Sequence, residues 1–338
     1  WLIKVNPDTT GDFKLREGTI GVADYAFAGC GGAATINIPS TISVVGNCAF
    51  LDCKSLAYID LSGVTALGER AFAGTALSSI LINDGVETIG KEAFAYCEML
   101  SDVIVGINVR SIGDYAFKDC SGLTSVHITD LAAWCGISFS DYYYYTNPFY
   151  YADDLYLNGK LITDLVIPDG VTTIKAYAFY KCAKLTKVTV ADSVTTIESG
   201  VFSGCKSLTD IKLPANLTTL KNGVFMDCTS LKSIVIPVGV TVLDKGMFNA
   251  CLSLESVTLP ETMTSMLGGF SFYHCTSLKT IILPDSMTNI GAATFQGCGA
   301  LESIVVGIAV KTIAGSAFAE CGGMLYLCKN IIDMEEKL

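Results

Sequence analysis

The amino-acid sequence predicts a mostly β solenoid, in which about a dozen short coils stack around one continuous core. Phenylalanine recurs at steps of 22 to 24 residues apart from one step of 62, and cysteine follows three residues later in eleven of twelve units. A short apolar segment with strand periodicity comes next in each unit. One coil of this size cannot bury its own apolar residues, so neighbouring coils must share a core. The recurring phenylalanines are Phe27, Phe50, Phe72, Phe94, Phe117, Phe179, Phe202, Phe225, Phe248, Phe272, Phe295 and Phe318.

Each part of the unit, A-F-x-x-C-x-x-L-x-x-I-x-[IL]-P-x-x-[VM]-x-x-I, has a structural interpretation. The alternation at the end of L-x-x-I-x-[IL] predicts a short strand, and the proline that often follows ends it because proline cannot donate a ladder hydrogen bond. A second apolar pair, such as Val194 and Ile197, runs back along the other side of the coil. Equivalent strands then lie side by side about 4.8 Å apart. We therefore expect a leucine-rich repeat solenoid, a curved right-handed coil with a parallel concave sheet and short turns or 3-10 segments elsewhere.

The cysteine column suits packing better than bonding. Stacked equivalents would lie within disulfide range, but parallel side chains do not favour the required dihedral angle, so small buried thiols are the better explanation. A column with one cysteine per coil and no C-x-x-C pair does not predict a metal site. We expect no metal and no cofactor. Cys321 and Cys328, both near the end of the sequence, are the first pair to examine for a bond.

Composition excludes several classes of function. The net charge is −11, which argues against nucleic acid and against anionic membrane surfaces. The sequence holds only two histidines, His127 and His274, although most catalytic bases and zinc sites use histidine. No apolar run reaches the roughly 18 residues that cross a bilayer, and no export signal opens the sequence.

One irregular segment, residues 130–159, interrupts the repeat and is rich in aromatic residues. Its DLAAWC portion predicts a short helix, and LYLNGKLITDLVIP predicts a hairpin through Asn158 and Gly159. Aromatic clusters anchor interfaces and stack on sugars, but they also pack an insertion onto its scaffold, and packing is the interpretation we favour for most of these rings. The candidate binding aromatics of the segment are Trp134, Tyr142, Tyr143, Tyr144, Tyr145, Tyr150 and Tyr151.

The insertion divides the chain into blocks. Residues 27–129 form the first block of repeats and residues 160–321 the second. Residues 1–26 hold a partial repeat and are expected to cap the solenoid. Residues 322–338 form either a second cap or a truncated end.

Side chains between the core residues of each strand must face outward on the concave sheet. They form two columns, and the second is unusually apolar for a solvent-facing position. The preference of β-branched residues for strands explains this column as well as a binding surface does. The candidate ligand-binding residues are Asp102, Ile104, His127, Val166, Lys187, Asp210, Lys212, Val235 and Ile282.

The unit AFxxCxxLxxIxIPxxVxxI resembles that of the BspA-like, or treponemal-type, leucine-rich repeat proteins. The resemblance covers residues 18–325, and the insertion LAAWCGISF…LYLNGKLITDLVIPDGV is similar to stretches found in that family. It implies a bacterial protein that is secreted or at the cell surface and that adheres to host matrix proteins, other bacteria or epithelium. It supplies no catalytic residues.

The leading hypothesis is a non-catalytic module that binds a protein ligand, either host matrix or another bacterial surface protein. The alternatives are a passive spacer or stalk, and a carbohydrate-binding module that uses the tyrosine-rich insertion. An enzyme is not expected, since no Gly-rich phosphate loop, H-E-x-x-H or G-x-S-x-G motif occurs. Two carboxylates facing each other at the insertion would be needed to revive a glycosidase.

Overall fold

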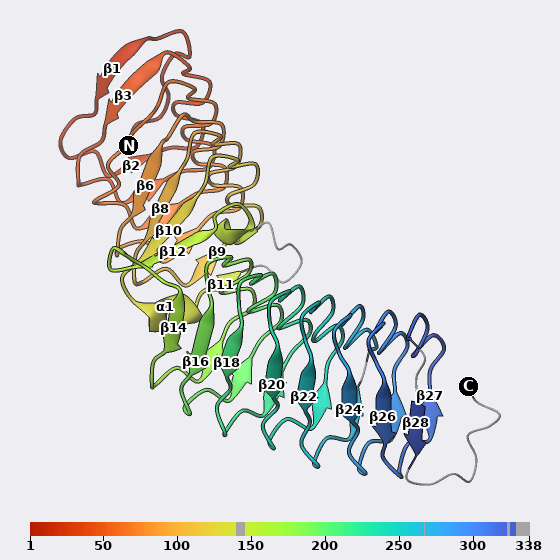
Figure 1. The fold of residues 1–338 in the computed structure, drawn as a ribbon. Coiled ribbons are helices and arrows are strands. Elements are labelled where there is room, and N and C mark those ends of the chain that lie inside the picture. Colours follow the sequence, from red (N-terminus) through yellow and green to blue (C-terminus); the bar gives the residue numbers. More distant parts are fainter. Residues whose placement is uncertain (140–145, 267, 323–324, 329–338) are drawn as a thin grey trace. The chain divides into compact units, whose positions relative to one another are not determined.

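A computed structural model describes residues 1–139, 146–266, 268–322 and 325–328, the last four by their backbone. The chain forms two compact units, Trp1–Ile162 (unit 1) and Thr163–Leu338 (unit 2). Each unit is a β solenoid in which short strands lie in two rows, one on each side of the coils (Figure 1). The predicted leucine-rich repeat solenoid is therefore confirmed for each unit.

In unit 1, five of the longer strands form one sheet, whose order is β13-β12-β10-β8-β6. We call this sheet the outer sheet; it consists of the strands that the sequence predicts for the concave face. All of its pairs are parallel except the hairpin of β12 and β13. Two earlier strands, β1 and β3, pair separately, and residues 57–61 between β3 and β6 form no strand. The strands of this row are β1 (Gly11–Lys14), β3 (Ala33–Asn37), β6 (Ser79–Ile82), β8 (Asp102–Val105), β10 (Ser125–Ile128), β12 (Asp154–Leu157) and β13 (Lys160–Leu161).

The second row of unit 1 is a six-stranded parallel sheet of two-residue strands. It holds β2 (Gly21–Val22), β4 (Val44–Val45), β5 (Ala66–Leu67), β7 (Thr88–Ile89), β9 (Ser111–Ile112) and β11 (Ser138–Phe139). Along the chain, the helix α1 (Leu131–Cys135) lies between β10 and β11, and the 3-10 turn η2 (Pro148–Tyr150) lies between β11 and β12.

Unit 2 repeats the same plan with parallel pairs throughout. Strand β18, which Pro214 follows two residues later, is three residues long, whereas β14 has four residues and ends directly before Pro168. The longer strands are β14 (Asp164–Ile167), β16 (Lys187–Val190), β18 (Asp210–Lys212), β20 (Ser233–Val235), β22 (Ser256–Thr258), β24 (Thr280–Ile282), β26 (Ser303–Val306) and β28 (Leu325–Cys328). The short ones are β15 (Thr173–Ile174), β17 (Thr196–Ile197), β19 (Thr219–Leu220), β21 (Val242–Leu243), β23 (Ser265–Met266), β25 (Asn289–Ile290) and β27 (Thr312–Ile313).

The core of both units is a column of stacked phenylalanine rings. In unit 1 the rings from Phe27 to Phe117 lie 5.1 to 5.6 Å apart between centroids. In unit 2 the rings from Phe179 to Phe318 lie 5.3 to 6.1 Å apart. Phe13 packs edge-on against Phe27 at 5.4 Å and so covers the first ring of the column. This placement agrees with a capping role for residues 1–26, although the predicted ranges of caps and blocks stay predictions.

The recurring cysteines are free thiols, and all but Cys321 are buried, as the packing interpretation predicts. Nine of them also donate a hydrogen bond to a phenylalanine carbonyl of the preceding coil. The Cys228 thiol donates to the Phe202 carbonyl oxygen of the preceding coil at 3.2 Å, and the equivalent contacts elsewhere measure 3.0 to 3.2 Å. Cys321 is one of these free thiols, bonded to the Phe295 carbonyl at 3.2 Å, so it forms no disulfide. The side chain of Cys328 lies outside the described residues.

The loop that carries each recurring phenylalanine contains two residues with left-handed backbone angles. One lies two positions before the phenylalanine and the other lies two positions after it. Around Phe117 these are Tyr115 (φ 58°) and Asp119 (φ 55°), and around Phe225 they are Gly223 (φ 58°) and Asp227 (φ 59°). Backbone N–H groups of these loops donate to carbonyl oxygens of the next coil, for example Asp227 N to Asn249 O at 2.8 Å. Side chains at equivalent positions of successive loops therefore lie in register.

Candidate functional site

The outer sheet of unit 1 sets four strands in register, and this places side chains of successive coils beside each other. Leu81, Ile104, His127 and Tyr156 are consecutive partners across β6, β8, β10 and β12. They alternate with the buried positions of the same strands, so they face outward. We call these four residues the outer-face column.

His127 is the centre of the outer-face column. Its ring stacks on Tyr156 with centroids 4.6 Å apart and planes 13° apart. Its Nε2 lies 3.3 Å from Oδ1 of Asp102, whose side chain is 40% exposed. Leu81, at the other end of the column, is 56% exposed. The column therefore combines exposed apolar surface with a polar contact at one edge, which is typical of a protein interaction surface.

A second line of residues runs beside the column and is polar. Asp102, Ser125 and Asp154 are consecutive partners across β8, β10 and β12. The Oδ1 atom of Asp154 is buried and has no hydrogen-bond partner among the described residues. His127 contacts Asp102, whereas the hydroxyl of Ser125 contacts that of Thr124 at 3.3 Å. This arrangement differs from a nucleophile paired with a base, which requires a hydrogen bond between serine and histidine.

Tyr156 is the functional candidate that sequence reasoning missed. It lies within the irregular segment, residues 130–159, where the repeat pattern predicts no outward column. The signal was present, because the sequence DLYL of β12 is similar to DLVI of β14. In both strands the second residue is buried and the third is not. The insertion thus contributes a regular strand to the outer sheet.

The candidates in unit 2 do not come together in the same way. Val166, Val235 and Ile282 are exposed by 63%, 65% and 61%, as expected of outward positions. Polar residues separate them, however, because Lys212 precedes the strand of Val235 and Thr258 follows it. Lys187 and Asp210 form an exposed ion pair at 3.4 Å. Exposed pairs of this kind contribute little to stability. Val166 is paired with Thr189 and Val235 with Thr258, whereas Ile282 is paired with the half-buried Val305 of β26.

The insertion aromatics are mainly structural where they are described. Trp134 is 1% exposed and packs edge-on against Phe139 and Phe149 at 5.6 and 5.8 Å, so it is not available to a ligand. The helix and the hairpin of this segment are confirmed: Asp130 caps α1 by accepting from Ala133 N at 2.8 Å, and β12 pairs antiparallel with β13. Tyr142, Tyr143, Tyr144 and Tyr145 lie outside the described residues.

Tyr150 and Tyr151 pack against each other with centroids 4.9 Å apart. The Tyr151 hydroxyl accepts from Asp119 N at 2.8 Å and lies 3.2 Å from Asp119 Oδ1. In the regular coils a backbone carbonyl accepts the hydrogen bond from the equivalent N–H group. For example, Tyr96 N donates to Lys118 O at 2.7 Å. Tyr151 therefore replaces a missing carbonyl of the interrupted repeat, and burial raises the pKa of its hydroxyl to about 12.

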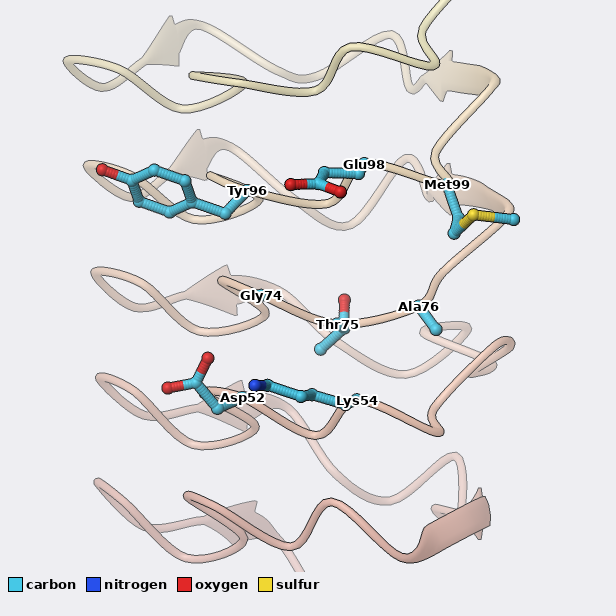
Figure 2. A pocket seen from close by; sticks show the side chains of 8 residues that line it. All are labelled: Asp52, Lys54, Gly74, Thr75, Ala76, Tyr96, Glu98 and Met99. Carbon is cyan, nitrogen blue, oxygen red and sulfur yellow. The ribbon is translucent and has the colours of Figure 1, made fainter.

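Unit 1 also has an open hollow of about 390 Å³ across the loops of three coils (Figure 2). Residues 74–76 form its floor, where the third coil has one residue fewer between Thr75 and Leu77 than its neighbours have between cysteine and leucine. The walls are formed by Asp52, Lys54, Tyr96, Glu98 and Met99. None of these residues belongs to the outer-face column, so unit 1 offers two separate surfaces.

The described residues contain no group of three or more histidine, cysteine or acidic side chains placed to hold a metal ion. Within the same part of the chain, no helix is long and apolar enough to span a bilayer. Burial raises the pKa of the Cys205, Cys228 and Cys251 thiols well above the ordinary value.

Stacked coils, two rows of parallel strands and an outward-facing sheet define a leucine-rich repeat protein. The chain belongs to the family with the BspA type leucine rich repeat region, whose model matches residues 20–144, 152–267 and 265–328. None of the curated proteins matches this sequence.

Solved structures share the fold. A leucine-rich repeat protein from Bacteroides ovatus has a TM-score of 0.65 and 23% identity, and the match covers 94% of this chain and 83% of that one. One from Eubacterium ventriosum has a TM-score of 0.57 and 21% identity over 80% of this chain and 83% of that one. The pneumococcal vaccine antigen PcpA has a TM-score of 0.53 and 15% identity over 97% of this chain and 91% of that one.

Proposed function

We propose that this chain is a non-catalytic module of a secreted or cell-surface bacterial protein, and that it binds a protein ligand on the outer sheet of unit 1. The observation that carries the proposal is the outer-face column: Leu81, Ile104, His127 and Tyr156 stand side by side without an intervening charged residue. Adjacent exposed apolar and aromatic side chains are the usual centre of a protein interface. The family resemblance supports the location at the cell surface.

The charges beside the column indicate what the ligand surface carries. Asp102 and Asp154 lie on the strands next to Ser125, and the chain as a whole has a net charge of −11. A ligand with an apolar centre and a basic edge would therefore be complementary to this face. Host matrix proteins and other bacterial surface proteins are the proposed sources of such a ligand.

The test is binding of the full chain to an immobilised panel of host matrix proteins and to bacterial surface extracts. Ile104→Asp places a charge in the middle of the outer-face column. It should cost about 2 kcal/mol of binding free energy, roughly a 30-fold loss of affinity. Val238→Asp is the matched control, because Val238 is 70% exposed in unit 2 and lies outside the outer sheet of unit 1.

If both variants unfold at the same temperature as the wild type, the fold is intact in both. If the panel retains the Ile104→Asp variant as strongly as the wild type, the proposal for this face is wrong. No retention of the wild type by any member of the panel would favour the passive spacer. Deleting residues 130–159 is not a suitable test, because it removes the buried Trp134 and the strand β12 along with any exposed aromatics.

A further inference from the structure

The hollow of unit 1 exists because the third coil is short. Two residues separate the cysteine from the leucine in the second and fourth coils, Cys53 to Leu56 and Cys97 to Leu100, but one residue separates Thr75 from Leu77. The floor is made of small side chains, and Thr75 is itself buried, with its hydroxyl donating to the Phe72 carbonyl at 2.9 Å. The side walls are the loops of the neighbouring coils (Figure 2).

Three equivalent left-handed positions shape the hollow: Asp52 (φ 55°), Gly74 (φ 70°) and Tyr96 (φ 62°). Their backbones are joined to successive coils, with Asp52 N to Ala73 O and Gly74 N to Ala95 O both at 2.8 Å. A Cβ on Gly74 would lie 2.5 Å from Oδ1 of Asp52, so this position favours glycine for space as well as for φ. Tyr96 therefore overhangs a position without a side chain (Figure 2).

Lys118 holds the Tyr96 ring at its hydroxyl end. The Lys118 ammonium, from the following coil, lies 5.3 Å from the ring centroid and donates to the Tyr96 hydroxyl at 3.1 Å. Figure 2 shows the Tyr96 ring broadly face-on at the edge of the hollow, and Tyr96 is 42% exposed. The hydroxyl is thus held in place while part of the ring remains accessible.

The hollow is lined by charges of both signs, two carboxylates and one ammonium. In Figure 2 the Lys54 ammonium points toward the Asp52 carboxylate, and the Glu98 carboxylate points toward Tyr96. A cationic ligand would meet Lys54 at the wall, and an anionic ligand would meet Asp52 and Glu98. A neutral ligand with hydroxyl groups can instead donate to the carboxylates and accept from Lys54.

We propose that this hollow binds a neutral saccharide ring, with its apolar face stacked on Tyr96 and its hydroxyl groups bonded to Asp52, Glu98 and Lys54. A sugar ring has both an apolar face and a rim of donors and acceptors, which matches an aromatic ring beside charged groups of both signs. The volume of about 390 Å³ lies in the range of small-molecule sites. This proposal is independent of the protein ligand proposed above, since the two surfaces share no residue.

The test is binding of the full chain to a printed array of neutral, sialylated and sulfated glycans, followed by titration with the best neutral glycan. Tyr96→Ala removes the ring and should weaken binding about tenfold or more. Tyr96→Phe keeps the ring face and should retain most of the affinity. Ala76→Gln places a flexible neutral side chain over the floor and should also weaken binding.

Two controls separate this site from other effects. Tyr25→Ala changes a tyrosine that is 57% exposed outside the hollow, and Ile104→Asp changes the outer-face column; both should bind the glycan as the wild type does. The proposal is overturned if no neutral glycan binds, if Tyr96→Ala binds as well as the wild type, or if only sialylated or sulfated glycans bind. Equal thermal unfolding of the Tyr96 variants excludes loss of the fold as the cause.

Discussion

The recurring cysteine is specified by a hydrogen bond as well as by its size. The Phe202 carbonyl accepts from Cys205 N of its own coil at 3.1 Å and from the Cys228 thiol of the next coil at 3.2 Å. Thr75, which occupies the cysteine position in the third coil, is also buried, but its hydroxyl donates to the Phe72 carbonyl of its own coil rather than to the preceding coil. Alanine would fill much of the same space but would leave one lone pair of a buried carbonyl unsatisfied.

Burial of these thiols predicts a loss of stability at alkaline pH. Burial raises the pKa of the Cys53 and Cys298 thiols from 9.0 to about 12 in the folded chain. Above pH 9 the unfolded chain releases these protons while the folded chain keeps them. The two thiols therefore contribute stability that is complete below pH 9 and is lost as the pH rises toward 12.

The measurement is denaturant unfolding of the wild type and of the double variant Cys53→Ala, Cys298→Ala across this pH window. Lysine and tyrosine residues also titrate there, but they are common to both proteins. The wild type should lose more stability than the double variant between the two ends of the window. Parallel curves would show that the thiols do not carry this dependence.

The element that departs from the repeat, residues 130–159, is a coil of the solenoid with irregular loops. Its strand β12 joins the outer sheet beside β10, its strand β11 joins the second row beside β9, and Phe149 is buried within it. Side chains replace the backbone groups that a regular coil would supply. Tyr151 accepts from Asp119 N, and Thr146 Oγ1 lies 3.4 Å from Tyr115 N.

Removing the Tyr151 hydroxyl should destabilise unit 1. Tyr151→Phe keeps the ring and deletes the acceptor of the Asp119 N–H, so the free energy of unfolding should fall by about 1 kcal/mol. Tyr58→Phe is the control, because the Tyr58 side chain is 67% exposed. Denaturant unfolding measures both. A change no larger than that of the control would mean that water replaces the hydroxyl without cost.

The local parts of this element could be predicted from the sequence, and the long-range parts could not. Asp130 before an apolar run and Asn158-Gly159 between alternating residues are local signals, and they correctly placed the helix and the hairpin. The pairing of Tyr156 with His127 depends on register across about 30 intervening residues, which the sequence pattern does not fix. The hollow also depends on stacking, because a missing residue in one coil matters only beside the loops of its neighbours.

At the scale of the whole molecule, the repeat makes most interactions short-range along the solenoid. In unit 2 the Phe225 ring stacks with the next ring on each side of the column, Phe202 at 6.1 Å and Phe248 at 5.6 Å between centroids. Its backbone N–H donates to Met247 O of the following coil at 3.1 Å. The stability of such an array is approximately a sum of coil and neighbour terms. The binding surfaces of one unit therefore tolerate changes several coils away.

This locality can be tested with one core substitution. Phe225→Ala removes a fully buried ring and should cost about 3–5 kcal/mol. Because its contacts reach one coil on each side, hydrogen exchange should accelerate in β18, β20 and β22 and stay near the wild-type rate in β6, β8 and β10 of unit 1. Phe225→Leu, which fills most of the space, should show the same pattern more weakly. Acceleration of equal size in all six strands would instead mean that the chain opens as one cooperative body, and a charge placed at one surface could then no longer be read as a local effect.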